Sequence, residues 1–417
     1  MSRRRVAVTG AGIVSCLGHS VAEVTPRLRR GESGVRAVPE WAELGIKSCV
    51  AGTIRDLEPA LERAAIPKKL RPAMSDAALF CAIASREAIQ AAGLEAKDLQ
   101  DPRVACIVGS GTGSSETVVE ASGLVASGRI RRVDPFSVLR CMASSASAAI
   151  GNLYGVRGPS YSIASACSTS AHCIGHAAQL IRWGIADLAL AGGGEDLYEM
   201  VTASFQGLRV ALSTGYNDTP ERASRPYDAD RDGFVIAGGG GLLVLEELEH
   251  ARRRGATVWA ELAGYAASSD GYDLVLPEPT GEQAARCMRE ALADAGLAPQ
   301  DVVYVYTHGT STVAGDVAEL EALRAVFGGD EVPPFSSSKS MTGHPIGAAG
   351  VHELTYCLAM MREGFLAPSI NIDHPAPELG ALPVITEAIE ARADVMLSNS
   401  FGFGGTNAAL VLRRVED

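Results

Sequence analysis

Short apolar runs that end near glycine alternate with helical patterns of small residues, and this order occurs twice along the chain. We expect strands at 6–10, 104–108, 188–194, 235–245, 258–265, 302–306, 335–338, 397–399 and 408–412. We expect helices at 74–92, 246–254, 282–295, 317–327 and 344–362. Strand–helix alternation favours α/β layers with a mixed sheet. The repetition predicts two similar halves, 1–255 and 256–417, packed face to face.

Length and composition limit the class of protein. A chain of 417 residues is long for one layered domain, and 47% hydrophobic with 21% charged residues is typical of a soluble globular protein. The net charge of −12 argues against a nucleic-acid partner. Nine cysteines without paired spacing indicate reduced thiols in a cytoplasmic protein.

Three segments have some features of a targeting, membrane-spanning or cofactor-binding signal. Arg3–Arg5 lead directly into a strand and lack the apolar core of a signal peptide. The longest uncharged stretch, 158–181, is Ser-rich and contains a proline, so we expect no membrane span. Gly10–Ser15 is close to a dinucleotide fingerprint, but Ser15 replaces the third glycine and no acidic strand end follows. Glycines packing a tight strand turn explain this segment as well.

The segment SACSTSAHC, residues 165–173, contains a candidate nucleophile, Cys167. The preceding run, 160–164, alternates like a strand, and apolar residues recur at helical spacing from Ile174 to Ile181. Cys167 is therefore predicted at a strand-to-helix turn, where free N–H groups and partial positive charge favour a thiolate. A buried cysteine in a core of small residues is an equal alternative on this segment alone.

Two histidines lie at comparable junctions. His308 (in HGTST, 308–312) and His344 (in KSMTGHP, 339–345) each follow a predicted strand, and a glycine-rich loop at 398–407 precedes the last strand. One cysteine and two histidines at strand ends make a convergent site plausible. The alternatives are structural imidazoles or a metal site. No CxxC spacing occurs, and the one HxxxH pair, His172 and His176, lies outside the strand-end junctions and is interpreted as structural, so we expect no metal.

Together these motifs resemble the β-ketoacyl-acyl-carrier-protein synthases, condensing enzymes of the thiolase superfamily. The resemblance runs from Val6 to Arg413 and is densest at SACSTSAHC, GGGE (192–195), LSTGYNDTPE (212–221), HGTST, KSMTGHPIGAAG (339–350) and SNSFGFGGTNA (398–408). SAHCIG and GYNDTPE look more like the type I than the type II synthase. The resemblance implies a thiolase-like αβαβα fold and decarboxylating condensation of an acyl-enzyme with malonyl-carrier protein in fatty-acid elongation. It implies no cofactor beyond the 4′-phosphopantetheine of the carrier protein.

The resemblance also implies roles for residues. Cys167 would carry the acyl group, its backbone N–H and that of Phe403 would form the oxyanion hole, and His308 and His344 would stabilise the enolate. Lys339 with Glu353 would position the histidines, and Thr310 with Thr312 would bind the pantetheine arm. Phe401 would gate the passage between the acyl and malonyl sites, and Phe205 and Thr112 would line the acyl pocket. Thr112 stands where the close relatives have Gly or Ile, which leaves the acyl length open.

The expected partners are acyl carrier protein and a second copy of the chain. Two local basic clusters are candidates for docking the acidic carrier protein: Lys68, Lys69 and Arg71, and Arg129, Arg131 and Arg132. The resemblance implies a homodimer in which the segment around Met142 reaches the partner's pocket. Two alternatives remain: the same chemistry in a specialised lipid or polyketide pathway, or a non-catalytic chain-length factor, which Cys167 with both histidines disfavours.

Overall fold

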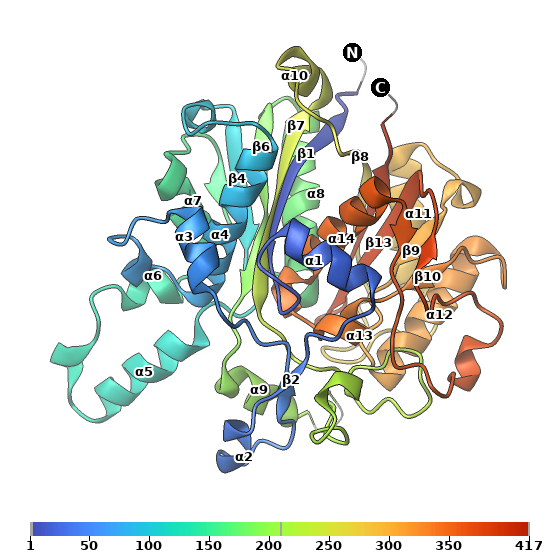
Figure 1. Ribbon diagram of the computed structural model, residues 1–417, viewed down its shortest axis with the longest axis horizontal. Helices are drawn as coiled ribbons and strands as arrows, with labels where there is room; N and C mark the ends of the chain where they lie inside the picture. The colour runs from blue at the N-terminus through green and yellow to red at the C-terminus, as the bar shows by residue number, and fades with distance from the viewer. Residues whose placement is uncertain (1–2, 209–210, 416–417) are drawn as a thin grey trace.

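Ten strands form one continuous sheet in the computed structural model, which describes residues 3–208 and 211–415 (Figure 1). The strands of the first half are β1 (Val6–Val14), β4 (Val104–Gly109), β5 (Ser160–Tyr161), β6 (Leu188–Glu195) and β7 (Gly239–Glu247). Those of the second half are β8 (Ala260–Ser269), β9 (Tyr304–Tyr306), β10 (Phe335–Ser336), β13 (Val395–Gly402) and β14 (Thr406–Arg413).

The strand order repeats between the two halves. The first half runs β1-β7-β6-β4-β5 and the second runs β8-β14-β13-β9-β10. In each, the first two pairings are antiparallel and the last two are parallel. The halves join where β1 pairs with β8 through Ala7↔Glu261 and Val8↔Ala260. The predicted pair of similar α/β halves is confirmed.

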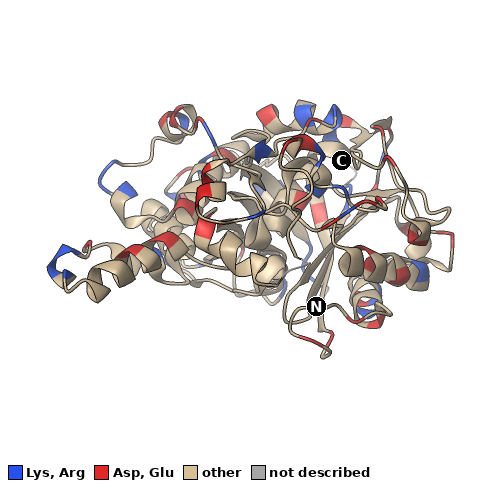
Figure 2. Ribbon diagram, turned by 90° about the horizontal axis from the view of Figure 1, so that it is seen from below, with Lys and Arg blue, Asp and Glu red and all other residues tan. Residues whose placement is uncertain are grey.

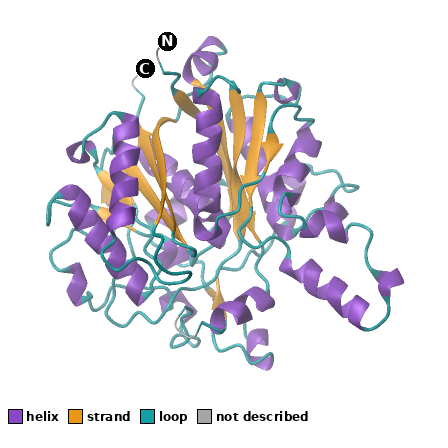
Figure 3. Cartoon of the chain, turned by 180° about the vertical axis from the view of Figure 1, so that it is seen from behind, coloured by secondary structure: helices purple, strands orange, loops and turns teal. Residues whose placement is uncertain are grey.

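Helices lie between the two halves of the sheet and on both outer faces (Figures 1 and 3). The inner layer is α8 (Thr169–Arg182) and α14 (Ala349–Glu363). The outer layers are α4 (Asp76–Ala91) with α7 (Ser145–Tyr154), and α11 (Glu282–Ala295) with α12 (Val313–Phe327). On β6 the side chains alternate, so that Ala189 and Ala191 join the inner core while Leu188 and Leu190 join an outer one. Three hydrophobic cores therefore hold together the five layers of the fold, which are two outer helix layers, two sheet halves and the inner helix layer.

The N-terminal glycines pack a helix rather than form a turn. β1 continues through Gly10 and Gly12 to Val14, with a register shift between Val8 and Gly10. A Cβ on Gly10 would lie 2.1 Å from Ala88 O, and one on Gly12 would lie 2.0 Å from Ala84 O. The predicted turn after Gly10 is thus wrong, because the glycines instead let α4 approach the strand closely.

Several boundaries near the site also differ from the prediction. The run 160–164 forms only the two-residue strand β5. The segment before β7 is not part of that strand, because Ile236 instead bridges to His344. His344 precedes the 3-10 turn Ile346–Ala348, and α14 begins only at Ala349. Helix α10 (Leu248–Arg253) is shorter than predicted, since β7 extends to Glu247.

The remaining elements are short. They are α1 (Val21–Arg29), β2 (Arg36–Ala37), α2 (Glu40–Glu43), β3 (Val50–Ala51), α3 (Glu58–Ala64), α5 (Ser115–Ala126), α6 (Ser137–Cys141), α9 (Glu199–Gln206), α13 (Lys339–Thr342), β11 (Phe365–Leu366) and β12 (Ile389–Glu390). The segment from α5 to α6 stands out from the body as an arm (Figures 1 and 3). Among the described residues, no helix is both long and apolar enough to cross a bilayer.

Candidate active site

Cys167 lies on the turn that leads into α8, as predicted. The 3-10 turn Ala166–Ser168 precedes the helix, and Ala166 has a φ of 49°, which is uncommon for a residue with a side chain. The hydroxyl of Ser168 donates to Ser400 O and to Thr406 O, both at 2.9 Å. A Cβ on Gly402 would lie 3.1 Å from Cys167 N. The turn of the first half is therefore held against the β13–β14 loop of the second.

The electrostatic state of the thiol differs from the sequence-based expectation. Burial raises the pKa of Cys167 to about 12, and this outweighs the opposing effects of the Lys339 charge and of the backbone N–H groups of Phe403 and Cys167. A helix N-terminus alone therefore does not produce a thiolate here. The backbone N–H groups of Phe403 and Cys167 both lower this pKa, so both lie near the sulfur.

His308 follows β9 and is fixed through its backbone. Its N–H and that of Gly309 donate to the two carboxylate oxygens of Glu319, each at 2.8 Å. The Lys339 ammonium lies 3.4 Å from His308 Nδ1 and donates to His308 O at 2.6 Å. Burial, followed by the Lys339 charge, holds the pKa of His308 well below its usual range, so the imidazole is neutral near pH 7.

His344 faces His308 nearly edge to face, with ring centroids 5.2 Å apart and an interplanar angle of 89°. Its backbone N–H donates to Val235 O at 2.7 Å. Both ring nitrogens are buried, and neither has a hydrogen-bond partner among the described residues. Burial and the Lys339 charge hold its pKa well below the usual range as well. His344 is thus a neutral imidazole whose polar atoms are available to a ligand.

Lys339 and Glu353 form a buried ion pair beneath the two histidines. Both side chains are almost fully buried, and the ammonium also bonds to the backbone of His308. Ser400 donates to the other oxygen of Glu353 at 3.3 Å. The pair therefore connects α13, α14 and the end of β13 to the turn that carries His308.

The three candidate side chains meet in one cavity. The sulfur of Cys167 and ring nitrogens of His308 and His344 all lie within 4.8 Å of one another. They line a cavity of about 680 Å³ whose walls are mainly apolar. A cysteine and two histidines at this spacing are also able to bind a metal such as Zn²⁺. Cys167 both lines the cavity and packs in an apolar cluster, so its role as nucleophile stays a prediction.

Five of the other predicted residues also line this cavity: Phe205, Thr310, Thr312, Phe401 and Phe403. The hydroxyls of Thr310 and Thr312 lie 3.0 Å apart. Phe401 contacts the His308 ring at a centroid distance of 5.8 Å, and Phe205 contacts Phe403 at the same distance. The cavity thus has a polar side at the threonines and an aromatic side beside Cys167.

Thr112 is not among the residues that line this cavity. It lies on the turn after β4, where its hydroxyl donates to Glu195 Oε1 at 2.5 Å and its N–H to the same oxygen at 2.9 Å. A Cβ on the adjacent Gly111 would lie 3.3 Å from Ala166 O, so the turn itself borders the nucleophile. The Thr112 hydroxyl therefore has a partner and is not a polar group left without an acceptor.

Three buried carboxylates that sequence reasoning did not assign hold the site's backbone. Glu195 also accepts from Gly111 N and Gly347 N, at 2.9 and 2.8 Å. Asp316 accepts from Thr310 N and Ser311 N at 3.0 and 3.1 Å, and Glu319 holds the His308 turn. Two sequence signals mark them. Glu195 ends an otherwise apolar strand, and Asp316 and Glu319 lie in the helix directly after HGTST.

Comparison with protein families finds two matching domain models. The beta-ketoacyl synthase N-terminal domain matches residues 3–251, and the beta-ketoacyl synthase C-terminal domain matches residues 259–373. The first match contains Cys167 and the second contains both histidines. The two matches therefore divide the site between them in the same way as the strand repeat.

Curated relatives match over nearly the full length. The chain is 48% identical over 413 residues to 3-oxoacyl-[acyl-carrier-protein] synthase 1 of Haemophilus influenzae, covering 99% of both chains. It is 46% identical over 416 residues to the protein of the same name of Escherichia coli, covering 99% of this chain and 100% of the relative. Identity to 3-oxoacyl-[acyl-carrier-protein] synthase 2 of Coxiella burnetii is 39%. The greater likeness to synthase 1 agrees with the sequence motifs.

Solved structures show the same fold. A beta-ketoacyl synthase from Burkholderia phymatum superposes with a TM-score of 0.92 at 35% identity, covering 99% of this chain and 100% of that one. A type II polyketide ketosynthase, solved with its acyl-carrier protein and bound to a hexaketide, superposes with a TM-score of 0.90 at 30% identity over 100% of both chains.

Proposed function

The chain belongs to the beta-ketoacyl synthase family, and from this we propose that it elongates acyl chains in type II fatty-acid synthesis. An acyl group on Cys167 would condense with malonyl-acyl carrier protein to give 3-oxoacyl-carrier protein, CO2 and free carrier protein. The observation that carries the proposal is the convergence of Cys167, His308 and His344 within 4.8 Å at the end of one cavity. The 48% identity to a synthase 1 supports it.

In the first half-reaction Cys167 takes the acyl group from the carrier protein's pantetheine thiol. Because its pKa is about 12, the thiol needs a base at the moment of attack, and a neutral imidazole lies within reach. The sulfur bonds to the thioester carbonyl carbon, and the oxyanion lies between the N–H groups of Cys167 and Phe403. One such donor contributes roughly 3–4 kcal/mol in the transition state. The proton then leaves with the carrier-protein thiol.

In the second half-reaction the two histidines hold the malonyl thioester carbonyl. Lys339 beside His308 Nδ1 leaves the proton of that neutral ring on Nε2, where it donates to the carbonyl oxygen. His344 donates its own ring N–H to the same oxygen. The carboxylate leaves as CO2, and its bonding electrons form the enolate. The enolate carbon attacks the acyl carbonyl, and the Cys167 thiolate leaves and regains its proton.

The remaining cavity residues bind and select the substrate in this proposal. Thr310 and Thr312 hold the amides of the pantetheine arm along the polar side of the cavity. Phe401, in contact with His308, gates the passage between acyl and malonyl positions. Phe205 limits the acyl chain from the cavity wall. Thr112 lies outside the cavity lining and limits the chain through its turn, which packs against Ala166 next to Cys167.

We propose that the site has no resident metal and no organic cofactor of its own. A metal ion on Cys167 would take the sulfur lone pair that must attack the acyl carbonyl, so one set of atoms cannot serve both roles. The test is metal analysis of purified protein, followed by condensation assays after EDTA. Stoichiometric zinc, or loss of activity that zinc restores, contradicts the proposal.

The proposed partners are acyl carrier protein and a second copy of the chain. The arm carries exposed apolar side chains, including Val125, Ile130 and Val138, and strand β5 leaves Tyr161 at an open sheet edge. A homodimer would cover these groups and bring Met142 toward the partner's pocket. Light scattering of the purified chain tests this.

We also propose residues 1–255 and 256–417 as the two halves of the chain. A cytoplasmic location is proposed as well, and the nine unpaired cysteines support it.

The same chemistry in a polyketide or specialised lipid pathway is the second candidate. The likeness of the fold to a polyketide ketosynthase favours it, although the identity to that chain is only 30%. A chain-length factor is a third and weaker alternative, because it would not need a nucleophile. Mass spectrometry of Cys167 after incubation with acyl-carrier proteins of graded length separates these cases. Acylation by saturated chains followed by 3-oxoacyl product supports fatty-acid elongation, whereas an unmodified Cys167 contradicts catalysis.

A further inference from the structure

Charged residues of this chain lie mainly on the outer helices and the loops, where water can solvate them (Figure 2). The cavity that contains Cys167 departs from this, because four carboxylates are among its lining residues: Asp232, Asp270, Glu278 and Glu319. A carboxylate oxygen in such a wall needs a hydrogen-bond donor to replace water. The donors to each carboxylate therefore show which of them can still accept a bond from a ligand.

Three of the four carboxylates have donors for both oxygens. Asp270 accepts from Asn407 Nδ2 at 2.6 Å and from Glu278 N at 3.2 Å. Glu278 accepts the N–H of Thr280 on one oxygen and the hydroxyl of Thr280 on the other. Glu319 accepts two backbone N–H groups, one on each oxygen. These three carboxylates hold the cavity wall together and are satisfied within it.

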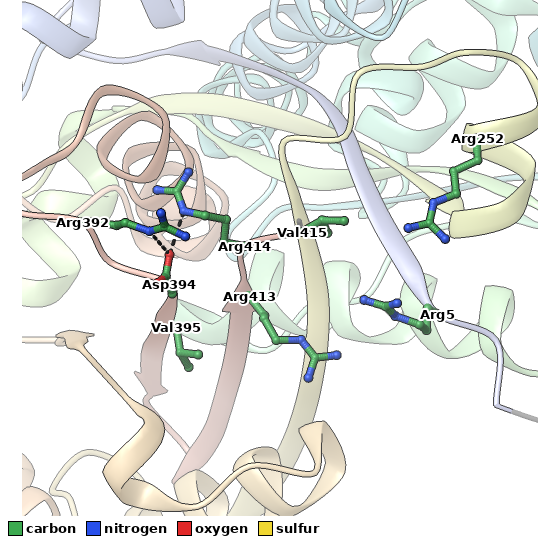
Figure 4. Close-up of a pocket in the computed structure, with 8 residues that line it drawn as sticks. All are labelled: Arg5, Arg252, Arg392, Asp394, Val395, Arg413, Arg414 and Val415. Carbon is green, nitrogen blue, oxygen red and sulfur yellow. Dashed lines mark hydrogen bonds and ion pairs between the residues drawn. The ribbon is translucent and has the colours of Figure 1, made fainter. Parts of the chain in front are cut away.

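The carboxylate of a second hollow, about 380 Å³ in volume, is satisfied in another way. Asp394 Oδ1 accepts from Arg392 at 2.8 Å and from Arg414 at 2.9 Å, and half of the Asp394 side chain is exposed to water (Figure 4). Asp394 therefore needs no ligand to complete its hydrogen bonds.

Asp232 differs from all of these carboxylates. Its Oδ2 accepts from Thr214 N and Gly215 N, both at 2.8 Å. Its Oδ1 is buried and has no hydrogen-bond partner among the described residues. Capping the turn at residues 214 and 215 accounts for one oxygen, and an asparagine would cap that turn equally well. The second oxygen remains an acceptor without a donor in the wall of the cavity.

Asp232 lies between the mouth of the cavity and its reactive end. On one side, Arg231 donates to Val313 O at 3.4 Å, and Val313 lines the cavity with 58% of its surface exposed. On the other side, the ring of Phe234 lies 5.6 Å from that of His344. The two residues from Asp232 to Phe234 span at most about 7 Å. A substrate that reaches His344 from the mouth therefore passes Asp232.

We propose that Asp232 Oδ1 accepts a hydrogen bond from the outer half of the pantetheine arm, an inference that rests on the proposed synthase function. The arm carries two amides and, beyond them, a hydroxyl. The nitrogen of the outer amide lies roughly 8–9 Å from the thioester sulfur along an extended arm, which matches the position of Asp232. A carboxylate is a stronger acceptor for this N–H or hydroxyl than a neutral oxygen. Asp232 thereby selects pantetheine thioesters over shorter ones.

Asp232→Asn tests the proposal, because it keeps an oxygen for the two backbone N–H groups and places an NH2 group where Oδ1 lies. A donor then faces the donor of the arm. The measurement is kcat/KM for acylation of Cys167 by acyl-pantetheine and by acyl-N-acetylcysteamine, which lacks the outer amide and the hydroxyl. We expect at least a tenfold loss with acyl-pantetheine, expressed in KM, and less than a twofold change with acyl-N-acetylcysteamine.

Asp301→Asn is the matched control. Asp301 also caps a turn, accepting from Ala298 N at 2.8 Å, and it is not among the residues that line the cavity. Both thioesters should react with this variant at wild-type rates. An equal loss with both thioesters in Asp232→Asn would show a structural role only, and a wild-type kcat/KM with acyl-pantetheine would show no role. Either result overturns the proposal.

Two analogues of acyl-pantetheine identify the donor and, on the wild type, require no variant that folds. An ester in place of the outer amide removes the N–H, and a deoxy analogue removes the hydroxyl. The analogue that lacks the true donor should react at least fivefold more slowly with the wild type, and its further loss with Asp232→Asn should be under twofold. Wild-type rates with both analogues overturn the proposal.

Direct binding separates this inference from the proposed function. The probe is free pantetheine, followed by ligand-observed NMR titration of the full chain. A wild type that no thioester acylates would contradict the synthase function. Even then, pantetheine binding at least tenfold weaker in Asp232→Asn than in Asp301→Asn supports the role of Asp232. Equal binding to the two variants overturns that role.

Discussion

Glu353→Gln tests the buried ion pair on which the histidine arrangement depends. The substitution keeps the size of the side chain but leaves the Lys339 ammonium without its anion in a site that is almost fully buried. Breaking a buried pair by removing one partner costs about 3–5 kcal/mol. For 417 residues at ~2.1 cal/mol/K per residue, the unfolding entropy is about 0.9 kcal/mol/K, so the melting temperature should fall by roughly 3–6 °C.

Malonyl decarboxylation should also fall, for a reason that is separate from the loss of stability. Without its anion the Lys339 ammonium moves, and His308 then loses the donor beside Nδ1 that keeps its own proton on Nε2. We expect malonyl decarboxylation by the variant to fall by at least tenfold at a temperature where it remains folded, while acylation of Cys167 persists. The assays are differential scanning calorimetry, CO2 release and mass spectrometry of the acyl-enzyme.

A double-mutant cycle with Lys339→Met measures the interaction energy between Lys339 and Glu353 apart from the effect of each single substitution. If the ion pair acts as a unit, the melting temperature of the double variant should lie above the value expected from adding the two single losses. Strict additivity, or a Glu353→Gln variant with wild-type stability and decarboxylation, would refute the reasoning.

Four further outcomes are expected. His344→Ala should abolish decarboxylation while Cys167 is still acylated; condensation at a near-normal rate would contradict its role. Alkylation of Cys167 by iodoacetamide should rise about tenfold per pH unit from pH 7 to 9, because a pKa of about 12 leaves the thiolate fraction growing throughout; a plateau below pH 8 would show a stable thiolate instead. Lys69→Glu and Arg132→Glu should raise KM for acyl carrier protein and leave small pantetheine thioesters unchanged, whereas equal loss on both substrates would indicate damaged folding. Thr112→Gly should extend the accepted acyl chain, each further buried methylene contributing roughly 0.8 kcal/mol; an unchanged chain-length profile would place Thr112 outside the acyl path.

Local patterns predicted the layered fold and pointed to three side chains that the structure brings together. Each of Cys167, His308 and His344 follows a run whose apolar character marks a strand end, and strand ends of one sheet edge converge. The two-residue β5 was overestimated, because an edge segment keeps the alternation of a strand without the neighbour that would extend its pairing. The continuation of β1 through Gly10 was missed, since the reason for that glycine is the backbone of α4.

The electrostatics of the site depended on contacts that no local pattern contains. The sequence around Cys167 indicates a helix N-terminus, which lowers a thiol pKa, but burial in an apolar cluster drawn from distant segments outweighs it. Glu195 and Glu319 were not assigned because their partners are backbone N–H groups, which any residue supplies. Thr112 was placed on the correct turn, while the carboxylate that receives its hydroxyl lies 83 residues away.

The bonds that hold the Cys167 turn also set the order in which the protein acquires activity during synthesis. Ser168 donates to backbone oxygens 232 and 238 residues further along the chain. At a translation rate of roughly 5–20 residues per second, those acceptors leave the ribosome more than about ten seconds after the nucleophile. Until then the inner face of α8 has no second layer to cover it. The turn that carries Cys167 therefore reaches its final surroundings only after β13 and β14, the last hairpin of the chain, have been synthesised and have packed against it.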